Sequence, residues 1–196
     1  MILRQLVHII LLCAAACATA GSSKSTVRFT ELDIALELPP TITFRSQDAS
    51  SGGNIKSGMQ CVRLLFRTTK RYAGEICASK DQDLLRDKGV VPYESIPSYA
   101  RTIEKPESGW VATSPMSLYP LLNFADSAFK TLAAVTDCDD SDGPIYRATA
   151  SCHVAVSGLN SGTVLYSSFL LRDPAKNKAG VSIEEIQQMW TNLAKQ

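Results

Sequence analysis

The stretch that decides the fold runs from Met59 to Ala78, MQCVRLLFRTTKRYAGEICA. In its first half Val62, Leu64 and Phe66 fall on one face and Cys61 falls on the other. Apolar residues at every second position are typical of a β-strand with one buried face. The second half has the same character and is long enough to return antiparallel to the first. The stretch therefore predicts a β-hairpin that carries one cysteine on each strand.

The register of this hairpin follows from placing Cys61 opposite Cys77. The other facing pairs are then Arg63 with Glu75 and Leu65 with Ala73. An opposite-charge pair across two strands contributes about 0.2–1 kcal/mol, so this register is physically consistent. We therefore predict a disulfide between Cys61 and Cys77.

Two further cysteines, Cys138 and Cys152, are left to pair by elimination, because Cys13 and Cys17 belong to the N-terminal leader discussed next. The four thiols lack the close Cys-x-x-Cys spacing of a zinc site, so we expect disulfides and no metal. A closed loop of about fifteen residues stabilises a fold by about 3 kcal/mol in the chain-entropy model. Two disulfides also indicate an oxidising compartment.

Residues 1–20 have the pattern of a secretory signal peptide. Arg4 precedes an apolar run over residues 6–16, and Ala18-Thr19-Ala20 provides a cleavage site of small residues. The run is shorter than the roughly 20 apolar residues of a membrane span. An alternative cut precedes Cys17, because Ala14-Ala15-Ala16-Cys17 resembles a bacterial lipobox, although Ala14 stands where that motif has a bulky residue. The cut site stays open, and a lipid on Cys17 is the only membrane attachment we expect.

Composition predicts a single domain over residues 21–196. Its apolar fraction, 45% for the whole chain, is ordinary for a chain that folds around its own core. The formal net charge is +1. A chain so close to neutrality lacks the basic surplus that a nucleic-acid partner requires.

The remaining pattern predicts an α+β fold, with an antiparallel sheet of about 5–7 strands, two main helices on one face and two disulfides. A long connection over residues 90–115 contains a short strand at 110–113. Strands are expected at residues 26–38, 41–45, 145–156 and 163–171, with a Ser/Gly-rich loop at 46–58. One or two helical turns are expected at 80–88, closed by Gly89, and a helix at 118–132. A last helix is expected at 183–193, after a capping box formed by Ser182 and Glu185.

Three groups of residues are candidates for binding a partner. Long connections are usually functional, and Trp110, with Tyr93 and Tyr99, offers aromatic side chains there that either anchor a partner or fill the core. Past the Arg63–Glu75 pair, the tip of the cysteine hairpin carries a basic cluster. This cluster consists of Arg67, Lys70 and Arg71. The third group lies in an acidic loop over residues 137–143 and consists of Asp139, Asp140 and Asp142.

The acidic loop does not fit a calcium site. With Gly143 at the sixth position of an EF-hand loop, Cys138 and Thr149 occupy the first and twelfth positions, which require carboxylates. A turn explains the same Asp, Ser and Gly residues. We expect no metal and no cofactor.

Catalytic motifs are absent from the sequence. It has no Gly-x-Ser-x-Gly elbow, no His-Glu-x-x-His helix and no phosphate-binding glycine loop. Once the leader is removed, His153 is the one remaining histidine, and its place on the polar face of a strand suggests a structural residue. We therefore predict no catalytic residues.

These observations favour an exported, non-catalytic binding protein of the periplasm or cell envelope. Its most concrete form is an inhibitor or immunity protein that blocks a toxin or hydrolase. One alternative is a structural or accessory lipoprotein of an envelope or secretion machine, anchored to the outer membrane through Cys17. Another is a secreted hydrolase that uses His153 with a carboxylate of the acidic loop.

Overall fold

A computed structural model describes residues 25–32, 34–46, 59–115, 117–125, 130–139, 149–158, 162–173, 175 and 179–193. The predicted leader with Cys17, residues 47–58 of the predicted Ser/Gly-rich loop, and Asp140 and Asp142 lie outside these ranges. Within them, no helix combines the length and the apolar character needed to cross a membrane.

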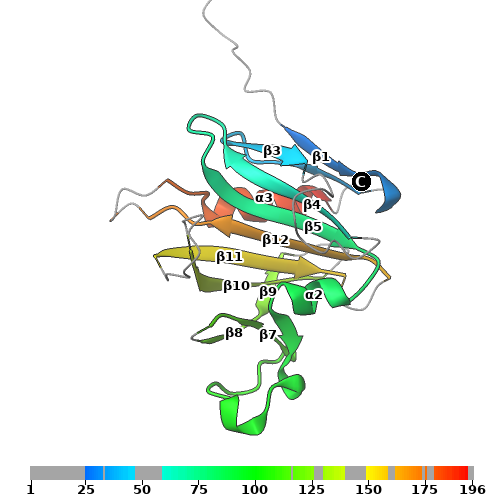
Figure 1. The fold of residues 1–196 in the computed structure, drawn as a ribbon, viewed down its shortest axis with the longest axis vertical. Coiled ribbons are helices and arrows are strands. Elements are labelled where there is room, and N and C mark those ends of the chain that lie inside the picture. The colour runs from blue at the N-terminus through cyan, green and yellow to red at the C-terminus, as the bar shows by residue number, and fades with distance from the viewer. Residues whose placement is uncertain are drawn as a thin grey trace, which may run out of the picture.

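A seven-stranded antiparallel sheet forms the body of the molecule (Figure 1), in the strand order β3-β4-β5-β12-β11-β10-β9. Its strands are β3 (Ile42–Ser46), β4 (Met59–Phe66), β5 (Tyr72–Ser79), β9 (Leu122–Ala125), β10 (Thr131–Cys138), β11 (Ala150–Ser157) and β12 (Val164–Leu170). The large antiparallel sheet of the sequence-based prediction is therefore confirmed.

Smaller elements surround this sheet. A hairpin of β1 (Thr26–Phe29) and β2 (Ile34–Glu37) stands at the N-terminal end, joined by the short 3-10 turn η1 (Thr30–Leu32). A second, three-stranded sheet has the order β6-β7-β8. The remaining elements are β6 (Val90–Pro92), β7 (Trp110–Thr113), β8 (Leu118–Pro120), the 3-10 turns η2 (Tyr93–Ser95) and η3 (Ser98–Ala100), and the helices α2 (Asp83–Asp87) and α3 (Ile183–Leu193).

The cysteine hairpin has the predicted register over most of its length. Cys61 faces Cys77 and forms the expected disulfide, and Arg63 faces Glu75. The predicted pairing of Leu65 with Ala73 is wrong, because a bulge after Leu64 shifts the register.

Gly74 lies next to the bulge, at a point where β12 approaches β5 closely. Its backbone has φ +144°, and a Cβ atom built there would collide with the carbonyl oxygen of Ser168 on β12. Only glycine accepts that conformation and that close approach. Beyond the irregularity, Leu65 faces Tyr72.

The second disulfide, between Cys138 and Cys152, is also confirmed. It joins β10 to β11, although the two residues are not directly opposite. Cys152 faces Thr136, and Cys138 faces Ala150, so the disulfide crosses the ladder diagonally.

The helix predicted over residues 118–132 is not present. The described part of this segment forms β8, β9 and the start of β10, and residues 126–129 lie outside the description. Pairing of β8 with β7, and of β9 with β10, takes precedence over the helix-like spacing.

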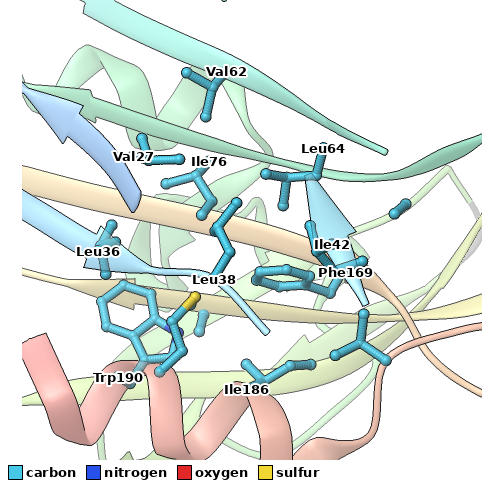
Figure 2. Packing of buried hydrophobic residues seen from close by; sticks show 14 of the residues in the cluster. Val27, Leu36, Leu38, Ile42, Val62, Leu64, Ile76, Phe169, Ile186 and Trp190 are labelled. Atoms are coloured by element: carbon cyan, nitrogen blue, oxygen red, sulfur yellow. The ribbon is translucent and has the colours of Figure 1, made fainter. Parts of the chain in front are cut away.

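One face of the large sheet, here called the helix face, is covered by α3 and the β1–β2 hairpin. Figure 2 shows Trp190 and Ile186 of α3 in one cluster with Leu36 and Leu38 of the hairpin region and the sheet residue Phe169. The first turn of α3 has the predicted capping box. The amide of Ser182 donates to Glu185 Oε2 at 2.9 Å, and the amide of Glu185 donates to Ser182 Oγ at 3.2 Å.

The opposite face, here called the arm face, is covered by α2 and the three-stranded sheet. Its core joins Cys77 and Tyr166 of the large sheet to Leu84 and Leu85 of α2 and to Leu121 before β9. Of the described helices, only α3 is longer than five residues, and α2 covers the other face. The prediction of two main helices on one face is therefore not confirmed.

Candidate functional site

The three-stranded sheet and the residues 93–109 that connect β6 to β7 form a unit that we call the arm (residues 90–120). Figure 1 shows it in green, extending from one side of the large sheet. Val91 faces Val111, and Ala112 faces Tyr119. The short strand predicted at residues 110–113 is β7.

The arm has a small hydrophobic core of its own. Tyr93, Ile96 and Val111 are buried in it. Half-buried residues pack around them, namely Val91, Ala100, Ile103 and Leu118. The loop side of the arm therefore has a small core of its own, while Val90 and Ala112 of its strands belong to the arm-face core.

Hydrogen bonds and ion pairs fix the loop of the arm around Tyr93. The Tyr93 hydroxyl donates to the carbonyl oxygen of Ile103 at 2.8 Å. The Arg101 guanidinium lies 5.1 Å from the centre of the Tyr93 ring, a cation–π distance, and its Nε donates to the carbonyl oxygen of Ile96 at 2.9 Å. Lys105 Nζ lies 2.6 Å from Glu94 Oε1, and this hydrogen bond lowers the pKa of the Glu94 carboxyl.

Two prolines limit the freedom of the same loop. Pro92 directly precedes the 3-10 turn η2, and Pro97 directly precedes η3. Proline fixes its own φ, so both turns begin from a restricted backbone. A loop ordered in this way loses less conformational entropy when it binds a partner.

Leu121, the residue directly after the arm, and Tyr119 within the arm attach it to the body. Leu121 is buried in the arm-face core, and its amide donates to the carbonyl oxygen of Trp110 at 3.1 Å. The Tyr119 hydroxyl donates to Asp137 Oδ2 of β10 at 2.6 Å. The position of the arm relative to β10 is therefore defined by both packing and a charge-assisted hydrogen bond.

Tyr99 stands out from the arm. It lies in η3, and of the large apolar side chains in the described part of the chain it is the most exposed, at 90%. The other two aromatic candidates have structural positions: Tyr93 is buried in the core of the arm, and Trp110 is half-buried against the arm-face core. The sequence alone did not decide whether each of these three aromatic side chains anchors a partner or fills the core.

His153 is more deeply placed than its strand pattern predicts. Its side chain is 2% exposed, and its ring packs 4.3 Å from the Phe124 ring, centroid to centroid. Burial lowers the pKa of His153 from 6.5 to about 4. The face expected to be polar is covered at His153, where Phe124 packs against its ring, and His153 has no access to a substrate in solution.

The basic cluster at the hairpin tip divides into two kinds of residue. Arg67 Nε donates to the carbonyl oxygen of Pro40 at 2.9 Å, and Nη2 donates to Ser25 Oγ at 3.0 Å. Arg67 thus links the hairpin to segments next to the N-terminal strands. Lys70 and Arg71 are exposed.

The acidic candidates are described only in part. Asp139 is half-buried just after β10, while Asp140 and Asp142 lie outside the described residues. A separate group of ligand-type atoms, from Cys61, Glu75 and Cys77, lies within 4.8 Å of one another. The disulfide uses both sulfurs, and Lys88 Nζ lies 2.6 Å from Glu75 Oε1, so this group is an ion pair beside a covalent link.

Comparison with known proteins gave no match to this chain: no family model, no curated protein and no solved structure is similar enough. The function is therefore argued from the geometry of the chain itself.

Proposed function

We propose that this protein is an exported, non-catalytic binding protein whose arm contacts a protein partner, most concretely a toxin or hydrolase that it inhibits. The observation that carries the proposal is the exposure of Tyr99 on an ordered loop. Tyrosine offers a large, stiff contact surface and is enriched among the residues that dominate binding energy.

The order of the arm supports a role in tight binding. Tyr99 lies between two parts of the loop that are fixed by Arg101 and by the buried Ile96. A partner that encloses Tyr99 would order little additional backbone, and preorganisation of this kind raises affinity. A projecting loop of fixed shape is suited to entering a concave surface such as an enzyme cleft.

The position of His153 supports binding over catalysis. A general base must come within about 3 Å of the proton that it removes, and a useful base has a pKa near the working pH. His153 is buried against Phe124 and has a pKa near 4, so it meets neither requirement.

Two disulfides support export to an oxidising compartment such as the periplasm. Whether the mature chain begins at Gly21 or carries a lipid on Cys17 does not change the proposed role of the arm. Mass spectrometry of the purified protein would distinguish the two N-termini.

Affinity capture from an envelope extract of the producing cells tests the proposal. The wild-type protein should recover a partner enzyme whose activity falls when the protein is added in excess. Tyr99→Ala should lose both capture and inhibition. A matched control is Leu122→Ala, which truncates an exposed large apolar side chain on β9, outside the arm, and should retain both. An enzyme that is captured but stays fully active would contradict inhibition, and equal capture by Tyr99→Ala would contradict the assigned surface.

A further inference from the structure

Three adjacent strands of the large sheet carry charged side chains at one level of the ladder. Arg45 of β3 lies directly opposite Arg63 of β4, and Arg63 lies opposite Glu75 of β5. Cys77, two residues beyond Glu75, belongs to the arm-face core. Side chains two positions apart on a strand share a face, and so do directly paired residues. The charged row therefore lies on the arm face, at the β3 edge of the sheet.

The pairing of Arg45 with Arg63 is unfavourable on its own. Like charges directly opposite each other on antiparallel strands destabilise a sheet. Glu75 compensates only in part, because Lys88 Nζ lies 2.6 Å from its Oε1 and this carboxylate already serves one cation. In these pairings three cations share the one carboxylate of Glu75. An added anion would therefore stabilise this part of the sheet.

Two neighbouring side chains complete the group. Thr43 lies two residues before Arg45 on β3 and shares its face. The Arg63 guanidinium lies 5.0 Å from the centre of the Tyr72 ring, a cation–π distance that limits its movement. Arg63 and Tyr72 are half-buried, whereas Arg45 is exposed. The group thus combines one held guanidinium, one guanidinium open to solvent and a hydroxyl, all of which donate hydrogen bonds.

From this arrangement we infer that Arg45, Arg63 and Thr43 bind a phosphate group, either free phosphate or the headgroup of an anionic lipid. A guanidinium presents N–H donors in a planar fork that matches the oxygens of phosphate. Facing residues have Cβ atoms about 5 Å apart, so two guanidiniums can bind one dianion together. Phosphate fits better than a carboxylate, which has one charge and two oxygens. This site goes beyond the proposed function, since Tyr99 takes no part in it.

Titration with inorganic phosphate, followed by NMR, tests the site. The readout is the Nε–H signals of the arginine side chains in isotope-labelled protein at constant ionic strength. We expect saturable shifts of the Arg45 and Arg63 signals with a millimolar dissociation constant. Acetate is the comparison ligand, and it should bind at least about 5-fold more weakly.

Two variants and one control assign the effect to the facing pair. Arg45→Gln and Arg63→Gln should each weaken phosphate binding about 3-fold to 10-fold. Arg28→Gln is the control, because Arg28 is an exposed arginine on β1 that faces Ala35 instead of a second cation. It should leave the dissociation constant within about 1.5-fold of wild type.

Thermal unfolding gives a second readout that a merely solvated arginine would not produce. Without phosphate, Arg45→Gln should melt about 1–3 °C above wild type, because the repulsion across the two strands is gone. At about ten times the dissociation constant, phosphate should raise the melting temperature of wild type by about 3–6 °C. The gain of Arg45→Gln should be smaller, since its affinity is lower.

Vesicles of phosphatidylcholine with and without phosphatidic acid distinguish the two sources of phosphate. Binding that requires phosphatidic acid, is displaced by inorganic phosphate and is lost in Arg45→Gln assigns the lipid headgroup. Phosphate shifts without vesicle binding assign the free anion. Arginine signals that do not move, equal affinity for acetate, or an equal loss of affinity in Arg28→Gln would overturn the inference. Tyr99→Ala should leave every one of these measurements unchanged, so failure of this site and failure of the arm are distinguishable.

Discussion

The body and the arm of this protein are stabilised in different ways. The body has seven strands, a hydrophobic core on each face of the sheet and two disulfides. The arm has three short strands, three buried residues in its own core and no cysteine. The body therefore carries most of the free energy of unfolding, whereas the arm presents an exposed aromatic residue. This difference suggests that stability and recognition can be altered separately.

The largest effect should come from the helix-face core of the body. Trp190 is fully buried there, and Trp190→Ala should lower the free energy of unfolding by about 3–5 kcal/mol. Urea denaturation followed by circular dichroism would measure this. A loss below about 1 kcal/mol would show that α3 contributes little to the body.

Removing one disulfide should have the next largest effect. The double variant Cys138→Ala/Cys152→Ala opens a loop of 14 residues and should cost about 3 kcal/mol. The same denaturation experiment measures it, with reduced wild-type protein as the reference for loss of both disulfides. If the double variant unfolds at the wild-type urea concentration, covalent stabilisation of the body is refuted.

Acid should weaken the body through His153. Above about pH 6.5 the imidazole is neutral in both the folded and the unfolded chain, so it contributes no pH dependence. Between pH 6.5 and about 4 only the unfolded chain takes up the proton, because burial lowers the folded-state pKa to about 4. The free energy of unfolding should therefore fall with decreasing pH, by up to about 3 kcal/mol at pH 4 and below.

His153→Phe isolates this contribution, because phenylalanine keeps the ring contact with Phe124 and cannot titrate. Urea denaturation at pH 7 and pH 4.5 should show a pH-dependent loss in wild type that is smaller by about 2–3 kcal/mol in the variant. Equal losses in the two proteins would mean that His153 is not desolvated in the folded state.

A smaller and local effect is expected in the arm. Tyr93→Phe removes the hydrogen bond to Ile103 and keeps the buried ring, so it should cost about 0.5–1.5 kcal/mol. Hydrogen exchange followed by mass spectrometry should show faster exchange in peptides from residues 90–113. Exchange in β11 and β12 should not change. A uniform increase across both regions would show that arm and body open as one unit.

The cysteine hairpin, the disulfides and α3 were predictable from sequence, because their signals are local, whereas β9 and β10 were not predicted as strands. Alternation around Cys61 and the Arg63–Glu75 pair fixed the hairpin register, and the Ser182–Glu185 capping box located the start of α3. The bulge at Gly74 was missed, because it depends on the close approach of Ser168 from another strand.

Features set by tertiary pairing were not predictable in this way. Residues 118–132 have helical spacing, but pairing with β7 makes β8 a strand and pairing with β10 makes β9 a strand. Leu122 lies within the predicted helix and is 60% exposed on β9. Nor did the sequence separate Tyr99 from Tyr93, because which aromatic side chain is buried depends on how the loop folds around Arg101.

The most direct test of the division between body and arm measures two quantities on Tyr99→Ala. These are its free energy of unfolding and its affinity for the captured partner. The account predicts an unfolding free energy within about 0.5 kcal/mol of wild type, because the side chain is exposed. It also predicts at least about a 30-fold loss of affinity, as expected for a dominant interface residue. Unchanged affinity, or a loss of stability comparable to that of Trp190→Ala, would contradict it.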